Sequence, residues 1–341
     1  QYCLYHTTIK NIINIMDKYD NNSSTTLEIS ASCAIGTEKV LYNELEHLQL
    51  RPFSKKPGRV NFMADDSGIA NALVNSRTAD RLFLVLDRFH AKDFDELYEA
   101  CNLIPWEKWV DKNDKLVIEK ARSFQSTLSS QRALQSISQK AAYDRLCRVY
   151  RQAVMPESGK KMSARIRIEK NLASIELDLC GEALSKRGYR KIPTEAPIKE
   201  SLAAAILYLA GWRRSFALYD PFCGSGTIPI EAALMALDIA PGLNRSFLWE
   251  SMPDGSKNAI AKAKEAAKSR INMERDINIR ASDIEGSKLD AAVFNTRLAG
   301  LEGRIGFSRA KAEDATPFAE RGFVISDPPY GKRLGSPEDA K

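Results

Sequence analysis

The chain has 341 residues, of which 44% are hydrophobic and 28% are charged. These values are typical of a folded protein with two or three domains, and they exclude a largely disordered chain. No run reaches the roughly 20 apolar residues that a membrane span needs, and the first residues lack a secretory pattern, so a cytoplasmic location is expected. Six scattered cysteines without a C-x-x-C spacing predict reduced thiols and no structural metal.

The net charge of +6 is unevenly placed along the chain. Residues 115–191 hold 17 Lys and Arg against 7 Asp and Glu, a local charge of +10, so the remainder carries about −4. This asymmetry favours a part that faces a polyanion, joined to a nearly neutral part, over a merely solvated surface.

The first half of the chain predicts an extension followed by an α+β region. Residues 1–26 end in the polar stretch "YDNNSSTT" and are predicted to be an N-terminal extension and linker. From Leu27 the strands "LEISASC", "GRVNFMA" and "RLFLVLDRF" alternate with two helices, the first capped by Thr37 and the second over 68–77, as in a ferredoxin-like unit.

A strand, a basic helix and a hairpin are expected next. The strand is "KLVIEKARS", the helix spans 131–154, and the hairpin joins "SARIRIEK" to "LASIELDL". The alternation predicts that Ile166 and Ile168 face the core while Arg165 and Arg167 face outward. We place the boundary of this second region, 27–191, near Lys191.

The third region, 192–341, has the pattern of a parallel, doubly wound α/β sheet. Its first helix is expected to have Thr194 as N-cap, Pro197 in the first turn and Gly211 just past its end. The strands "FALYD", "INIRASD", "RIGFSRA" and "GFVISD" then follow with helices between them.

The stretch "YDPFCGSGTIPIE", residues 219–231, places a glycine turn between a strand and a helix. Such a turn presents backbone N–H groups and the positive helix end to an anionic group. It lacks the lysine of a phosphate loop, and Pro229 occupies the third glycine position of the dinucleotide fingerprint, so NAD is disfavoured.

Three acids each follow a strand of the predicted parallel sheet. Asp220 would repel a pyrophosphate but attract an ammonium, and the methionine part of S-adenosylmethionine carries both an ammonium and a carboxylate. Asp283, 63 residues later, is then placed for the ribose hydroxyls, and Asp314 for the adenine amine. Each acid alone could be an ordinary loop residue, but three in this order favour the cofactor.

The stretch "SDPPYG", residues 326–331, follows the fourth strand, where ligands bind in such sheets. Asp327 and the Pro328 carbonyl can each accept an N–H of a planar exocyclic amine, so that the nitrogen lone pair can point at a methyl group. Pro329 stiffens the turn, and Tyr330 offers a stacking face worth roughly 1 to 3 kcal/mol. Orienting the two reactants can supply on the order of 7 to 11 kcal/mol. None of the three histidines lies in this region, and Asp327 or water can take the amine proton.

These motifs, together with "EAPIKESLAAAIL", "IAPGLNRSF" and "DPPYGKRLG", resemble the THUMP-domain 23S rRNA guanine-N2 methyltransferases. The resemblance runs from about Leu27 to the end. It implies a ferredoxin-like plus THUMP region that holds RNA, followed by a Rossmann-like class I domain that uses S-adenosylmethionine. The site residues that it implies are, for the cofactor, Asp220, Phe222, Gly224, Gly226, Thr227, Asp283 and Asp314, and, for the acceptor guanine, Asp327, Pro328, Pro329 and Tyr330.

One departure from the family pattern keeps other functions open. Class I sheets have seven strands, whereas only "GKRLGSPEDAK" follows the fourth strand here, so the domain is expected to be incomplete at its C-terminal side. An adenine-N6 or other amine methyltransferase, or a non-catalytic RNA-binding assembly factor, remain alternatives to guanine-N2 methylation.

Overall fold

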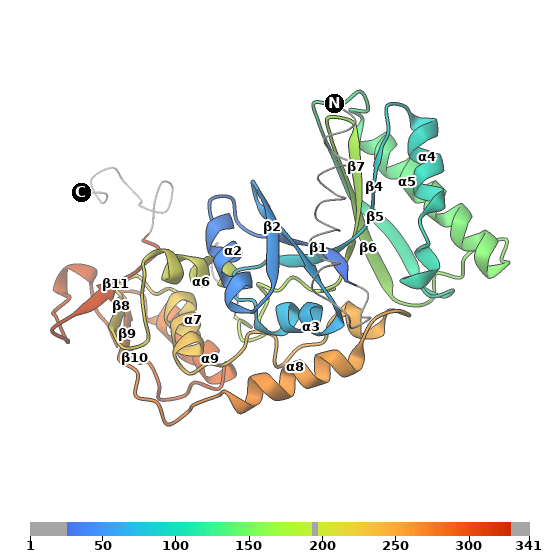
Figure 1. The fold of residues 1–341 in the computed structure, drawn as a ribbon. Coiled ribbons are helices and arrows are strands. Elements are labelled where there is room, and N and C mark those ends of the chain that lie inside the picture. Colours follow the sequence, from blue (N-terminus) through green and yellow to red (C-terminus); the bar gives the residue numbers. More distant parts are fainter. Residues whose placement is uncertain (1–25, 193–196, 329–341) are drawn as a thin grey trace.

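A computed structural model describes residues 26–192 and 197–328 (Figure 1). The predicted N-terminal extension, apart from its last residue, lies outside these ranges, as do Thr194, Pro329 and Tyr330.

The first elements form the predicted ferredoxin-like unit. Their order is β1 (Leu27–Ser32), α2 (Glu38–His47), β2 (Arg51–Lys56), β3 (Arg59–Ala64), α3 (Asp66–Asn75) and β4 (Arg81–His90). The strands lie side by side in the order β2-β3-β1-β4, with antiparallel pairing throughout. Thr37 is the N-cap residue of α2, as expected, although its hydroxyl donates to the Ala34 carbonyl rather than accepting from the helix.

The next elements extend the same sheet rather than building a separate one. They are α4 (Phe94–Leu103), η1 (Trp106–Lys108), β5 (Lys115–Phe124), α5 (Gln131–Tyr150), β6 (Lys161–Glu169) and β7 (Leu172–Asp178). Because β7 pairs with β4, the result is one seven-stranded sheet in the order β2-β3-β1-β4-β7-β6-β5. Helices α4 and α5 lie together on one face of its β5–β7 end (Figure 1).

Two expectations about this region need correction. Helix α5 ends at Tyr150, four residues before the predicted end, because Arg151 adopts a left-handed conformation at φ 53°. The arginines of β6 do alternate with buried Ile166 and Ile168, but they are not freely exposed. Arg165 and Arg167 both form ion pairs with Glu176, which is 1% exposed, so these two arginines are turned to a buried carboxylate instead of to solvent.

The described part of the second half forms a parallel sheet of four strands. Its elements are α6 (Glu200–Leu209), β8 (Ala217–Asp220), α7 (Thr227–Ala236), η2 (Leu248–Ser251), α8 (Lys257–Ser269), β9 (Ile279–Asp283), α9 (Gly286–Leu298), β10 (Gly306–Arg309), η3 (Ala312–Asp314) and β11 (Gly322–Val324). The strand order is β10-β9-β8-β11. Strands β9 and β10 follow on one side of β8, whereas β11 lies on its other side, as in a doubly wound sheet. The predicted α/β class with a preceding ferredoxin-like unit is therefore confirmed.

The start of α6 differs from the sequence expectation. The helix begins at Glu200 with Lys199 as N-cap, so Pro197 precedes it instead of lying in its first turn. Gly211 does follow the end of the helix, at φ +71°, a conformation that glycine adopts without a steric penalty.

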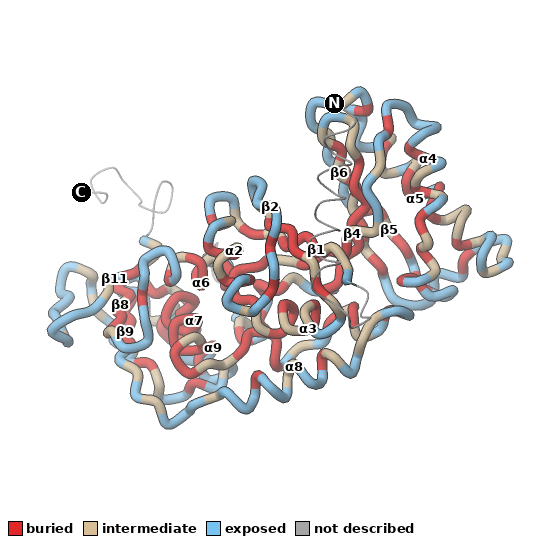
Figure 2. Tube along the Cα trace, viewed as in Figure 1, coloured by how far each residue is buried: buried red, intermediate tan, exposed pale blue. Residues whose placement is uncertain are grey.

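The two sheets are joined by packing as well as by the chain. Trp249 and Ile260, from the second half, lie in the hydrophobic core of the first, and Trp249 stacks on Trp109 with ring centroids 5.8 Å apart. Helix α8 runs along α3 in Figure 1. Buried residues follow the strands of both sheets and helix α7 (Figure 2). Within the described ranges, no helix has the length and apolar content to cross a bilayer.

Candidate active site

Asp220, the last residue of β8, is buried at the carboxyl-terminal edge of the parallel sheet. Its side chain is 1% exposed, and its Oδ1 accepts hydrogen bonds from the Phe222 N–H (3.1 Å) and the Ser326 hydroxyl (2.5 Å). Burial raises the pKa of Asp220 to about 7 against the effect of these hydrogen bonds, and the charges of Asp283 and Asp327 raise it further. A cationic partner would favour the charged form, so Asp220 is suited to bind a positively charged group.

The glycine turn follows directly and leads into α7. Gly224 and Gly226 have φ values of +52° and +82°, which side chains rarely permit. A Cβ on Gly226 would also lie 3.1 Å from the Cβ of Ala292 on α9. Gly226 is the N-cap of α7 and supplies no side-chain cap, so the first N–H groups of the helix and its positive end remain available to an anion.

Asp283, the last residue of β9, is hydrogen-bonded to this turn. It is 6% exposed, and its two oxygens accept from the Gly224 N–H (3.0 Å) and the Glu285 N–H (2.9 Å). Each carboxylate oxygen has a further lone pair, which leaves acceptor capacity for a hydroxyl group. The carboxylate therefore fixes the glycine turn and can still accept from a ligand.

The loop that follows β11 and contains Ser326 and Asp327, called the acceptor loop below, starts beside β8. Strand β11 pairs in parallel with β8, and the Ile325 N–H continues the ladder to the Tyr219 carbonyl (3.0 Å). Ser326 then reaches Asp220, and Asp327 follows, half-buried and close enough for its charge to affect the pKa of Asp220. Asp220 and Asp327 thus lie at the ends of adjacent strands and on the same edge of the sheet.

The other predicted residues lie less centrally or outside the described ranges. Thr227 is 3% exposed at the start of α7, and Phe222 is exposed on the turn. Asp314 is exposed on η3, beyond β10, and is not among the charges that raise the pKa of Asp220. Pro328 is exposed.

Sequence reasoning missed several residues that hold these groups in place. Ser326 opens the predicted motif without a role of its own there, although its hydroxyl ties the acceptor loop to Asp220. Asn295, on α9, donates to the Ser225 carbonyl of the turn (3.1 Å). The Tyr219 and Ser282 hydroxyls are 2.7 Å apart and join β8 to β9. Only the position of Ser326, next to Asp327, could have indicated such a role.

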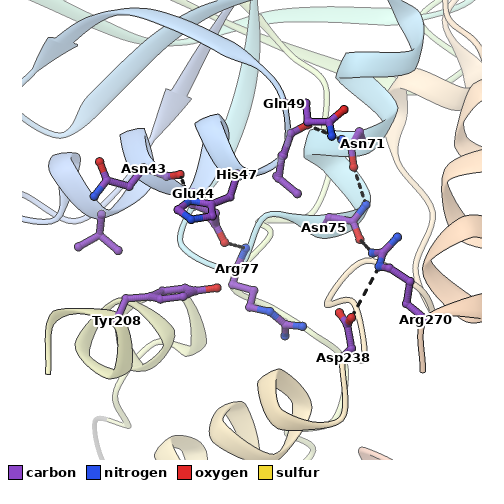
Figure 3. A pocket seen from close by; sticks show the side chains of 12 residues that line it. Asn43, Glu44, His47, Gln49, Asn71, Asn75, Arg77, Tyr208, Asp238 and Arg270 are labelled. Atoms are coloured by element: carbon purple, nitrogen blue, oxygen red, sulfur yellow. Dashed lines mark hydrogen bonds and ion pairs between the residues drawn. The ribbon is translucent and has the colours of Figure 1, made fainter. Parts of the chain in front are cut away.

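A cavity of about 680 Å³ lies at the opposite end of α7 from the glycine turn. Arg77, in its wall, donates to the Leu234 and Ile239 carbonyls at the carboxyl end of that helix (3.4 and 2.9 Å). Arg77, Tyr208, Asp238 and Arg270 converge on it from different elements (Figure 3). It lies between the two halves and is separate from the Asp220 site.

Comparisons with known proteins agree with the fold. The model of the UPF0020 family, described as RMKL-like methyltransferase domain, matches residues 187–341, and that of the RlmL ferredoxin-like domain matches residues 28–83. "Putative RNA methyltransferase YpsC" of Bacillus subtilis (strain 168) is 38% identical over 307 residues, which cover 89% of this chain and 79% of the relative. The chain therefore belongs to the RMKL-like methyltransferase family.

Two further comparisons bear on the substrate and the cofactor. "Ribosomal RNA large subunit methyltransferase K/L" of Syntrophotalea carbinolica (strain DSM 2380 / NBRC 103641 / GraBd1) is 31% identical over 336 residues, which cover 92% of this chain but 46% of that protein. The crystal structure of "SMU.472, a putative methyltransferase complexed with SAH" is 33% identical, with a TM-score of 0.85 over 94% of this chain and 84% of that chain.

The residues around Asp220 fit S-adenosylmethionine, the methyl donor that the sequence predicts. The buried Asp220 carboxylate suits an ammonium, the uncapped N-terminal end of α7 suits a carboxylate, and Asp283 keeps acceptor capacity for a hydroxyl.

Proposed function

We propose that this chain methylates the exocyclic N2 of a guanine in RNA, with 23S rRNA as the substrate. The observation that carries the proposal is the junction of Asp220 and Asp327 at one sheet edge, joined through Ser326. A cofactor residue and an acceptor residue of the proposed reaction therefore share that edge. The names of two relatives, an RNA methyltransferase and a large-subunit rRNA methyltransferase, support RNA as the substrate.

In this proposal each cofactor-binding residue binds a different polar group of S-adenosylmethionine. Asp220 binds the ammonium, and the start of α7, with Thr227, binds the carboxylate. Asp283 accepts from the ribose hydroxyls, and Asp314 from the adenine amine, while Phe222, Gly224 and Gly226 shape the turn. Once bound, S-adenosylmethionine supplies an electrophilic methyl group on a sulfonium.

The acceptor residues orient the guanine. Asp327 and the Pro328 carbonyl accept the two N–H groups of the exocyclic amine, which directs its lone pair towards the methyl group. Pro329 keeps the turn stiff, and the base stacks on Tyr330. The methylated nitrogen becomes strongly acidic, and its proton passes to Asp327 or to water.

The basic region would hold the RNA. In this proposal residues 1–26 are an extension and linker, 27–191 the ferredoxin-like and THUMP region, and 192–341 a class I methyltransferase domain. Arg132 and Lys140 are exposed on the outer face of α5, away from its buried residues Leu134 and Ala141. Phosphate contacts by such side chains give affinity without sequence choice.

Nucleoside mass spectrometry after labelled-methyl transfer to 23S rRNA tests the proposal. The full-length protein should produce N2-methylguanosine. A product of N6-methyladenosine would refute the guanine assignment but not the methyltransferase chemistry. RNA binding without any cofactor binding in calorimetry would instead favour an assembly factor.

A further inference from the structure

The linker between the two halves, which follows β7 and includes Arg190 and Lys191, contacts the glycine turn directly. Arg190 donates through Nη2 to the Thr227 hydroxyl (3.0 Å) and to the Ile198 carbonyl (2.7 Å), and it pairs with Glu200 at 3.3 Å. Thr227 is the first residue of α7, whose N-terminal end borders the turn. One arginine of the linker therefore fixes the residue at which the turn becomes a helix.

The turn is also held from its other side. The Lys191 N–H donates to Asn295 Oδ1 (3.4 Å), and Asn295 Nδ2 donates to the Ser225 carbonyl (3.1 Å). Asn295 is fully buried, so its hydrogen bond to the turn is shielded from solvent. Two consecutive linker residues thus act on the two ends of the segment Ser225–Thr227.

The contact of Arg190 sets the direction of the Thr227 hydrogen bond. A guanidinium has donors and no acceptor, so the Thr227 oxygen must accept from it. The hydroxyl proton is then left for another acceptor, and Thr227 becomes a donor at the positive end of α7. Glu200, which is largely buried, balances the charge of Arg190, so the guanidinium can stay close to that helix end.

We propose that Arg190 is a positioning residue that makes Thr227 a hydrogen-bond donor to the carboxylate of the bound cofactor. This inference rests on the proposed assignment of the glycine turn to the cofactor. It goes beyond that assignment because it gives the linker a part in selecting a ligand that carries a carboxylate. Arg190 itself does not touch the ligand in this proposal.

Calorimetry with two ligands separates this role from a purely structural one. S-adenosylhomocysteine carries the carboxylate, whereas decarboxylated S-adenosylmethionine lacks it and keeps the ammonium. In the full-length protein, Arg190→Gln should weaken S-adenosylhomocysteine binding about tenfold and leave the decarboxylated ligand within about twofold. Thr227→Val should give the same pattern, and the double variant should lose no more than either single variant.

Two further variants serve as controls. Arg190→Lys keeps a side chain that only donates, so it should recover most of the lost affinity. Arg214→Gln removes an exposed arginine of the same half and should change neither affinity. Equal weakening of both ligands by Arg190→Gln, or no weakening of either, would overturn the inference. Failure of the unaltered protein to bind S-adenosylhomocysteine would overturn the proposed cofactor site instead.

Discussion

The Ser326 hydroxyl donates a 2.5 Å hydrogen bond to the carboxylate of Asp220 and so joins the acceptor loop to the last residue of β8. The two residues are separated by 106 positions in the chain, and they meet because β11 inserts beside β8. The site therefore depends on the strand order as much as on its motifs.

Asp327→Ala should abolish methyl transfer while changing cofactor affinity little. In the proposed function this carboxylate accepts from the acceptor amine, and loss of one such oriented partner costs about 10² to 10³ in kcat. Labelled-methyl transfer to rRNA measures the rate, and calorimetry with S-adenosylhomocysteine measures the affinity. Near-normal turnover in this variant would remove Asp327 from the catalytic assignment.

Cofactor affinity should rise with pH up to about 7 and then level off. Burial raises the pKa of Asp220 from its ordinary 3.8 to about 7, so at lower pH the ammonium must first displace a proton. Well below that pKa, affinity should change about tenfold for each pH unit. Calorimetry at several pH values measures this slope, which Asp220→Asn should remove. A slope that persists in Asp220→Asn would assign the titration to another group.

The raised pKa of Asp220 also affects how the stability of the ligand-free protein depends on pH. Between about pH 4 and 7 the unfolded chain has Asp220 charged while the folded chain keeps it protonated. The folded state then binds more protons, so its free energy of unfolding should fall as the pH rises through this window. Thermal unfolding of the unaltered protein and of Asp220→Asn should show a smaller fall in the variant.

Gly226→Ala should destabilise the protein more than Gly224→Ala. Both substitutions place a side chain at positive φ, at a cost of roughly 1 to 2 kcal/mol each. A Cβ on Gly226 would also lie 3.1 Å from the Cβ of Ala292, whereas a Cβ on Gly224 would have no neighbour within 4 Å. Urea unfolding should therefore separate them by about 1 kcal/mol or more. An equal loss in both variants would show that α9 moves away to accommodate the added methyl group.

Reversing the charges of Arg132 and Lys140 to Glu should weaken RNA binding without changing cofactor affinity. Both side chains are exposed on α5, and each RNA phosphate that is no longer neutralised should make the log-log slope of affinity against salt shallower by about 0.7 to 0.9. Lys262→Glu with Lys268→Glu on α8 is a matched control, since these residues are also exposed. An equal effect of both pairs would mean that net charge, not the α5 surface, governs binding.

Most of the strands and the glycine turn could be predicted from local patterns, although β2 was missed. Alternation marked β6 and β7, and the order of strand, glycine and helix marked β8 and α7, because these signals lie within about ten residues. The pairing of β4 with β7 has no such signal. Leu84 lies opposite Leu177, but neither sequence stretch indicates that it pairs with the other. The single seven-stranded sheet therefore emerged only from the structure.

The same limit applies to the site. Asp220 and Asp283 could be placed by counting strands, because parallel strands bring their carboxyl ends together. Ser326 and Arg190 act through single side-chain contacts to Asp220 and Thr227, which depend on rotamers and on neighbouring elements. Pro197 was misplaced for a related reason: proline favours a first helical turn but does not require one.

The continuous hydrogen-bonded sheet also has a mechanical consequence. A backbone ladder running from β2 to β5 leaves no hinge between the ferredoxin-like strands and those beneath α5. In the proposed function, an RNA bound beside α5 is therefore held by the same sheet that carries the ferredoxin-like strands, so that the folded shape of the RNA, rather than its local sequence, can determine which nucleotide reaches Asp327.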